Sequence, residues 1–176
     1  MRNRIFLLWL FCASFLSGQV ANGNENSFDS SLRHEASTLL TEWMDAFLSY
    51  QCTNSHPALD GGILCPACAR IHGRIGDAVL PLMYLADKTG NNKYLFGAKR
   101  LMAWMENIHR PDGSWMNDVH VSDWNGTTVF ASIALYEALH HHGHLLDDST
   151  RNHWKQQLVE AGDFMMNNPF IYSRNR

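Results

Sequence analysis

The densest group of chemically active side chains lies between Cys65 and Arg74, in the segment Cys-Pro-Ala-Cys-Ala-Arg-Ile-His-Gly-Arg. A guanidinium can hold a carboxylate through two parallel hydrogen bonds, and an imidazole can act as a general acid or base. Gly73 separates His72 from Arg74 and would let the backbone approach a ligand closely. We therefore predict that His72 and Arg74 bind a uronate sugar. The alternative is that Arg74 pairs with Asp77 and that His72 only packs.

The cysteines of this region leave three interpretations open. Thiolate and imidazole are zinc ligands, so one tetrahedral set would consist of Cys52, Cys65, Cys68 and His72. The Cys-x-x-Cys spacing also suits a disulfide between Cys65 and Cys68. In the third interpretation the thiols are small buried groups that brace the loop. The working prediction is that the chain binds no metal and no other cofactor.

A second polar stretch, residues 110–128, combines carboxylates with flat aromatic rings: Asp112, Trp115, Asp118, Asp123 and Trp124. Most glycoside hydrolases use two carboxyl groups on either side of the scissile bond. We predict that Asp118 and Asp123 are the catalytic pair and that Trp115 and Trp124 bind sugar rings. Asp112 fits better as a turn residue in Pro-Asp-Gly. The alternative for Asp123 is a cap in front of the next helix.

The elements that must position these two stretches are helices. Apolar residues recur at helical spacing over residues 31–50, 76–88, 92–109, about 127–142 and 149–167. The connections alternate between short and long, which predicts helical hairpins in a weak repeat of roughly fifty residues. No segment shows convincing strand alternation. The predicted fold is all-α: an α/α toroid of helical hairpins, incomplete, with about five helices.

The start of the chain has the features of a secretory signal. Arg2 and Arg4 precede an apolar segment, 5–16, which is short for a membrane span. We predict a signal peptide over residues 1–21, a mobile leader over 22–30, and the toroid domain over 31–176. The mature protein would then be secreted or periplasmic, with no stable membrane span. The net charge of −3 gives no electrostatic basis for nucleic-acid binding.

Three segments resemble one known family: Cys65 to Arg74, Arg110-Pro-Asp-Gly-Ser-Trp115, and Asn117-Asp-Val-His-Val-Ser-Asp-Trp124. Over about residues 61–167 the chain resembles the N-terminal part of secreted bacterial six-hairpin glycosidases, β-glucuronidase-like members among them. The resemblance implies a glycoside hydrolase that acts on uronic-acid-containing glycans, with its site at one mouth of the toroid.

Two further functions stay open on the same residues. One is a polysaccharide lyase or uronate epimerase, in which a neutralised uronate carboxylate and a His or Tyr base do the chemistry. The other is a non-catalytic helical binding module. A six-hairpin toroid needs twelve helices, so this chain would be an N-terminal fragment. We expect the isolated fragment to be inactive and the remainder of the toroid to be its partner.

Overall fold

The computed structural model describes residues 28–54, 56–117 and 126–168. Contacts divide the chain into two units, residues 1–42 and 43–176. The regular elements of the described residues are helices, and β-pairing within them is limited to three isolated bridges. The all-α prediction is therefore confirmed. Closure into a toroid stays a prediction.

The described part of the first unit is helical from residue 28 onward. The helix expected from Ser31 thus begins earlier, and residues 28–30 are not the predicted leader. The predicted signal peptide, residues 1–21, lies outside the described residues. Among the helices that are described, none combines the length and the apolar composition that a bilayer crossing requires.

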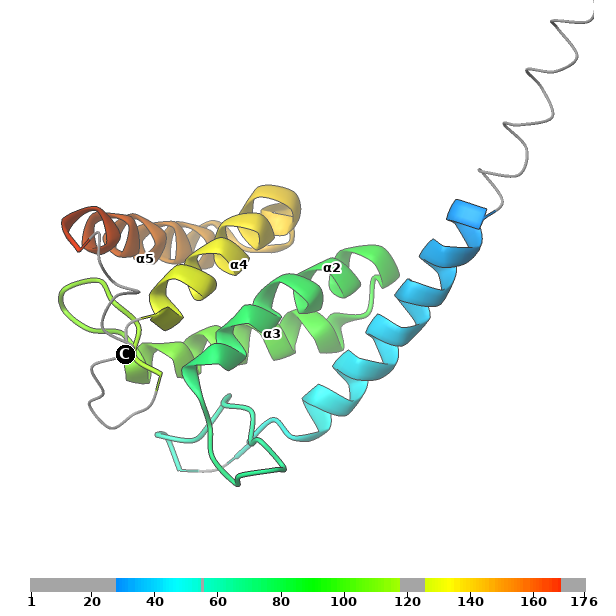
Figure 1. The fold of residues 1–176 in the computed structure, drawn as a ribbon, viewed down its shortest axis with the longest axis horizontal. Helices are drawn as coiled ribbons and strands as arrows, with labels where there is room; N and C mark the ends of the chain where they lie inside the picture. Colours follow the sequence, from blue (N-terminus) through cyan, green and yellow to red (C-terminus); the bar gives the residue numbers. More distant parts are fainter. Residues whose placement is uncertain (1–27, 55, 118–125, 169–176) are drawn as a thin grey trace, which may run out of the picture. The chain divides into compact units, whose positions relative to one another are not determined.

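Helices α2 (Val79–Thr89) and α3 (Asn92–Met105) form the first hairpin of the second unit, and Figure 1 shows them side by side. Gly90 ends α2 in a left-handed conformation (φ 66°), which glycine adopts at little cost. Asn91 then caps α3, because its side chain accepts a hydrogen bond from the backbone N–H of Lys93. The short connection predicted between these helices is confirmed.

A short 3-10 helix precedes α2 and another follows α3. The first, η1 (Gly73–Ala78), takes up the start of the helix predicted from residue 76, so α2 begins at Val79 with Pro81 in its first turn. The second, η2 (Glu106–Ile108), takes up the end of the helix predicted to reach residue 109.

The second hairpin consists of α4 (Gly126–His142) and α5 (Asp148–Asn167), joined through η3 (Gly143–Leu145). Helix α4 packs against α2, α5 and η1, so it links the two hairpins (Figure 1). The core beneath them is made of large apolar side chains that are almost fully buried: Leu82, Met83, Leu85, Leu101, Trp104, Met105, Ile108 and Leu135.

Asp147 caps α5, and its hydrogen bonds lead us to expect that the stability of the fold falls in acid. Its carboxylate accepts hydrogen bonds from the backbone N–H of Thr150 (2.9 Å) and from Lys99 Nζ (3.0 Å). These bonds hold the pKa of Asp147 well below its usual range. The stability that they contribute is therefore present above about pH 4, the unfolded-state range, and is lost as the pH falls further. Asp147→Asn retains a capping oxygen but should remove this acid dependence.

The measurement is urea unfolding of Asp147→Asn and the wild type at about pH 7 and about pH 3. The wild type should lose more of its midpoint on acidification than the variant does. The control is Asp163→Asn, at an exposed position of α5, which should behave like the wild type. Equal acid sensitivity in all three proteins would contradict the role of Asp147.

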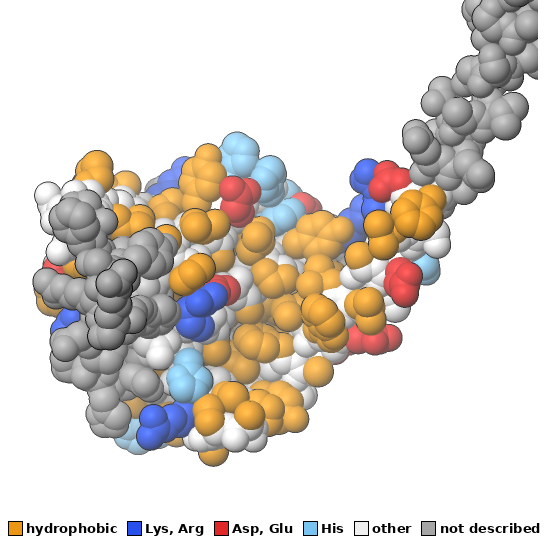
Figure 2. All heavy atoms as spheres, in the orientation of Figure 1, with side chains coloured by type: hydrophobic (Ala, Val, Ile, Leu, Met, Phe, Trp, Pro, Cys, Tyr) orange, Lys and Arg blue, Asp and Glu red, His pale blue; other side chains and the backbone are white. Residues whose placement is uncertain are grey.

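Several large apolar side chains on the outside of the second unit stay exposed: Phe96 (α3), Ile133 and Tyr136 (α4), and Val159 and Met166 (α5). Figure 2 shows hydrophobic side chains spread over much of one face of this unit. Exposed apolar area of this kind is common at surfaces that contact further protein.

Candidate functional site

The segment from Cys65 to Arg70 folds back on itself as a tight loop. The N–H of Cys65 donates to the carbonyl of Arg70 (2.8 Å), and the N–H of Ala69 donates to the carbonyl of Cys65 (2.9 Å). Ala69 takes a positive φ of 53°, which is uncommon for a residue with a Cβ. This loop brings the thiols of Cys65 and Cys68 close to the imidazole of His72.

The three donor atoms of Cys65, Cys68 and His72 all lie within 4.8 Å of one another. Cys68 Sγ lies 3.0 Å from His72 Nε2. The three described cysteines are free thiols, and Cys52 is not part of this group. The structure therefore brings together three of the four candidate zinc ligands that the sequence contains.

The two thiols of the loop are not equivalent. The Cys68 thiol donates a hydrogen bond to the sulfur of Cys65, and backbone N–H groups of Cys68 and Ala67 point to the same sulfur, so the pKa of Cys65 lies below its usual value. The same thiol–thiol bond raises the pKa of Cys68. The two pKa shifts have opposite directions because the same hydrogen bond contributes to both.

Gly73 allows a close backbone approach, although the neighbour is the protein itself and not a ligand. Its N–H donates to the carbonyl of Asn117 (2.6 Å). A Cβ at this position would lie 2.3 Å from the carbonyl oxygen of Met116. The contact fastens the His72–Arg74 segment to Asn117, the last described residue before 118–125.

Replacement of Gly73 by alanine should therefore loosen the site. The added methyl would meet backbone, which cannot rotate away, so we expect a loss of about 1–3 kcal/mol in the free energy of unfolding. Urea unfolding measures this loss. The matched control is Gly162→Ala in α5, where no atom lies within 4 Å of the new Cβ, and where alanine should stabilise the helix by about 0.5–1 kcal/mol. A neutral effect at Gly73 would contradict the close contact.

Arg74 is held in place by two partners. Its Nε and Nη2 donate to Oδ2 of Asp77 (2.9 and 2.6 Å), and its guanidinium carbon lies 3.8 Å from the ring centre of Phe130. From the sequence, pairing with Asp77 was the alternative to a ligand contact for Arg74, and the structure contains this pairing. It does not use the whole side chain, because among the described residues Nη1 has no hydrogen-bond partner and 43% of the side chain is exposed. One edge of the guanidinium thus stays open to a carboxylate.

The described part of the second polar stretch has a structural role. Asp112 accepts hydrogen bonds from the N–H and the hydroxyl of Ser114 (3.0 and 2.6 Å), as expected of a turn residue. Burial of Asp112 opposes ionisation, but these bonds hold the pKa of its carboxyl below the usual value. The backbone N–H of Trp115 donates to Thr128 Oγ1 (2.9 Å).

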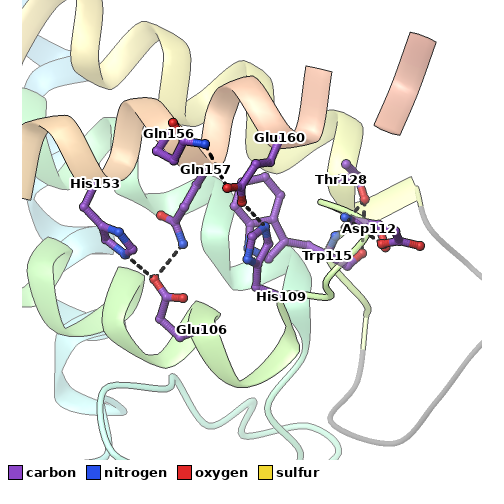
Figure 3. A network of polar contacts seen from close by, with 10 residues as sticks. Glu106, His109, Asp112, Trp115, Thr128, His153, Gln156, Gln157 and Glu160 are labelled. Carbon is purple, nitrogen blue, oxygen red and sulfur yellow. Dashed lines mark hydrogen bonds and ion pairs between the residues drawn. The ribbon is translucent and has the colours of Figure 1, made fainter. Parts of the chain in front are cut away.

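The side chain of Trp115 is fully buried, with its ring 5.0 Å from that of His109 (Figure 3). In this arrangement the ring belongs to the core, and a sugar cannot stack on it. Asp118, Asp123 and Trp124, the other residues predicted in this stretch, lie outside the described residues. Their predicted catalytic and binding roles are untested.

A network of polar side chains joins η2 to α5, as Figure 3 shows. Glu106 accepts hydrogen bonds from His153 Nε2 and Gln157 Nε2, both at 2.6 Å. His109 Nε2 lies 3.8 Å from a carboxylate oxygen of Glu160. These contacts dock α5, and two of the residues, Glu106 and His153, also line a groove of about 390 Å³ between α3 and α5.

This network was not predicted from the sequence, although one signal for it exists. Gln157 lies three residues after Trp154 and four before Ala161, so it falls on the buried face of α5, and it is only 2% exposed. A polar residue on such a face needs a partner, and the partner here is Glu106. Glu106 lies 51 residues before Gln157, so the spacing within α5 does not identify it as the partner.

Comparison with known proteins identifies a family whose model matches most of the chain. Residues 40–175 match a protein family described as the ulvan lyase N-terminal domain. A broad-specificity ulvan lyase from Formosa agariphila is 43% identical over 131 residues, which cover 73% of this chain and 20% of that enzyme. The chain thus spans about one-fifth of the length of this curated relative. No solved structure matches the chain.

Proposed function

Because this chain belongs to the ulvan lyase N-terminal domain family, we propose that it is the N-terminal part of a polysaccharide lyase that cleaves uronate-containing glycans. From the sequence, a glycoside hydrolase was the first hypothesis and a polysaccharide lyase was an alternative to it. The named relative, which is a lyase, favours elimination over hydrolysis. The implied substrate class, a glycan with uronate residues, is the same in both.

Elimination and hydrolysis cleave a polysaccharide by different chemical steps. In elimination a base removes the proton from C5 of the uronate, a double bond forms between C4 and C5, and the bond from C4 to the leaving oxygen breaks. That oxygen takes up a proton, and no water is consumed. The negative charge that develops next to the uronate carboxylate must be neutralised, and preorganised cationic donors provide such stabilisation.

The open edge of the Arg74 guanidinium is the observation that carries the proposal. Asp77 and Phe130 fix the side chain while Nη1 stays available to pair with a uronate carboxylate. His72, two residues away, would contribute a further contact to the glycan, as would Trp124. Asp118 and Asp123 were predicted as the catalytic pair of a hydrolase, whereas in a lyase a His or Tyr side chain would be the base.

The test is cleavage of ulvan by the full-length protein that contains this chain. A lyase releases products with a new ultraviolet absorbance from the C4–C5 double bond, in step with new reducing ends. New reducing ends without that absorbance would indicate a hydrolase and contradict the proposal. Glycan binding without cleavage would favour the non-catalytic module. A neutral polysaccharide serves as the control substrate and should not be cleaved.

The exposed apolar side chains of α3, α4 and α5 support the expectation that the rest of the enzyme covers this domain. The relative is about five times longer than its matched segment, so enough chain exists in such proteins to do this. Export to the periplasm or the medium would fit an enzyme acting on a polysaccharide, and it rests on the predicted signal peptide.

A further inference from the structure

The Cys65–His72 loop presents a compact set of soft metal ligands on the protein surface. Two thiols and one imidazole nitrogen lie within 4.8 Å of one another, and Cys68 is exposed. We propose that Cys65, Cys68 and His72 bind a zinc ion through Sγ, Sγ and Nε2, with the fourth position taken by water or another small ligand. This differs from the sequence-based prediction of no metal.

The distances between the donor atoms fit zinc after small movements. Zinc–sulfur bonds of about 2.3 Å and zinc–nitrogen bonds of about 2.0 Å place tetrahedral ligand atoms roughly 3.5–3.8 Å apart. The Cys68 Sγ to His72 Nε2 distance is 3.0 Å, and no pair of donors exceeds 4.8 Å. Each donor would therefore shift by no more than about 1 Å to surround an ion.

The backbone of the loop already has the form that such a site needs. The bridge between Cys65 and Arg70 closes the loop, and both thiols end on the same side of it. Backbone N–H groups of Ala67 and Cys68 point to the sulfur of Cys65, as donors behind a thiolate ligand do in metal sites. The positive φ of Ala69 is the strained element that lets the chain turn back after Cys68.

The composition of the set selects the ion. Thiolate ligands favour zinc, copper(I) and iron–sulfur clusters, while imidazole suits zinc. A cluster is normally held by four thiolates, and this set has two. A disulfide between Cys65 and Cys68 would leave unexplained why His72 Nε2 lies 3.0 Å from Cys68 Sγ. Zinc accounts for all three donors together.

The proposed ion would stabilise the segment that carries Arg74, without itself being part of elimination. His72 would use Nε2 for the metal, and Nδ1 would stay available for the predicted contact to the glycan. Arg74 lies two residues after His72, in η1, and is held separately by Asp77. The zinc site does not depend on the proposed lyase activity and can be tested without it.

The experiment measures zinc in the full-length protein, purified under reducing conditions, by elemental analysis after dialysis. About one zinc per chain is expected. Cys65→Ser, Cys68→Ser and His72→Ala should each weaken zinc binding by more than about 100-fold, since losing even a residue behind a ligand costs roughly 10- to 100-fold. Cys52→Ser is the matched control and should retain the wild-type affinity, because Cys52 is outside the donor set.

Cobalt(II) provides a readout of the ligands themselves. Bound to the protein in place of zinc, it should give thiolate-to-metal charge-transfer absorption that disappears in Cys65→Ser and Cys68→Ser. Circular dichroism checks that each variant is folded. Absence of zinc and of this absorption in the folded, reduced wild type would overturn the proposal. A loss of binding in Cys52→Ser equal to that in Cys65→Ser would overturn the three-ligand set.

Discussion

Replacing Trp115 by alanine is expected to lower the free energy of unfolding by about 3–5 kcal/mol, the range typical of buried Trp and Phe. The side chain is fully buried against His109, which in turn lies 3.8 Å from Glu160 of α5, so the cavity would also loosen this contact with α5. Its Nε1 has no hydrogen-bond partner among the described residues. Trp115→Phe retains most of the ring and removes this unpaired donor, so its effect should be smaller.

Urea unfolding followed by circular dichroism measures both variants. The matched control is Trp43→Ala, because Trp43 is 65% exposed and surface substitutions usually change stability by less than about 0.5 kcal/mol. A role of Trp115 in stacking on sugar would give a different result. Trp115→Ala would then keep its stability and raise KM, and this outcome would contradict the buried position.

The helices were predictable because apolar spacing and helix-ending residues agreed with each other. The spacing in 79–89 and 92–105 marks two buried faces, and Gly90 separates them. The end of α3 was not predictable in this way. The carbonyl of Ile108 accepts a hydrogen bond from the N–H of Met116, and His109 pairs with Trp115. This pairing with a later segment ends the α-helix at Met105, whereas apolar spacing alone continues to Ile108.

The candidate site shows the same division between local and long-range information. Residue types and spacing were sufficient to mark the Cys65–Arg74 segment as chemically unusual. They could not separate Cys52 from the cluster, because that depends on how the loop closes. Nor could they show that Gly73 contacts Met116, or that Trp115 is in the core. The Gly73–Met116 contact joins segments about forty residues apart, and the burial of Trp115 depends on how several elements pack, so periodicity encodes neither.

The proposed lyase activity makes Arg74 the described side chain with the largest expected effect on catalysis. Arg74→Ala should lower kcat/KM on ulvan by about 30-fold or more, since truncating one partner of a hydrogen-bonded charge pair costs about 2–5 kcal/mol. Arg74→Lys keeps the charge but loses the planar fork that matches a carboxylate, so it should recover only part of the activity. The steady-state rate of double-bond formation measures both variants.

The fold should survive these substitutions, because the Arg74–Asp77 pair is partly exposed and such pairs contribute about 0–1 kcal/mol. Arg70→Ala is the matched control. It removes the same charge from an exposed position four residues away, and it should change kcat/KM by less than about threefold if attraction of the polyanion is screened by salt. Equal losses in Arg70→Ala and Arg74→Ala would mean that general charge attraction, and not a specific carboxylate contact, explains the effect. Full activity in Arg74→Ala would remove Arg74 from the site.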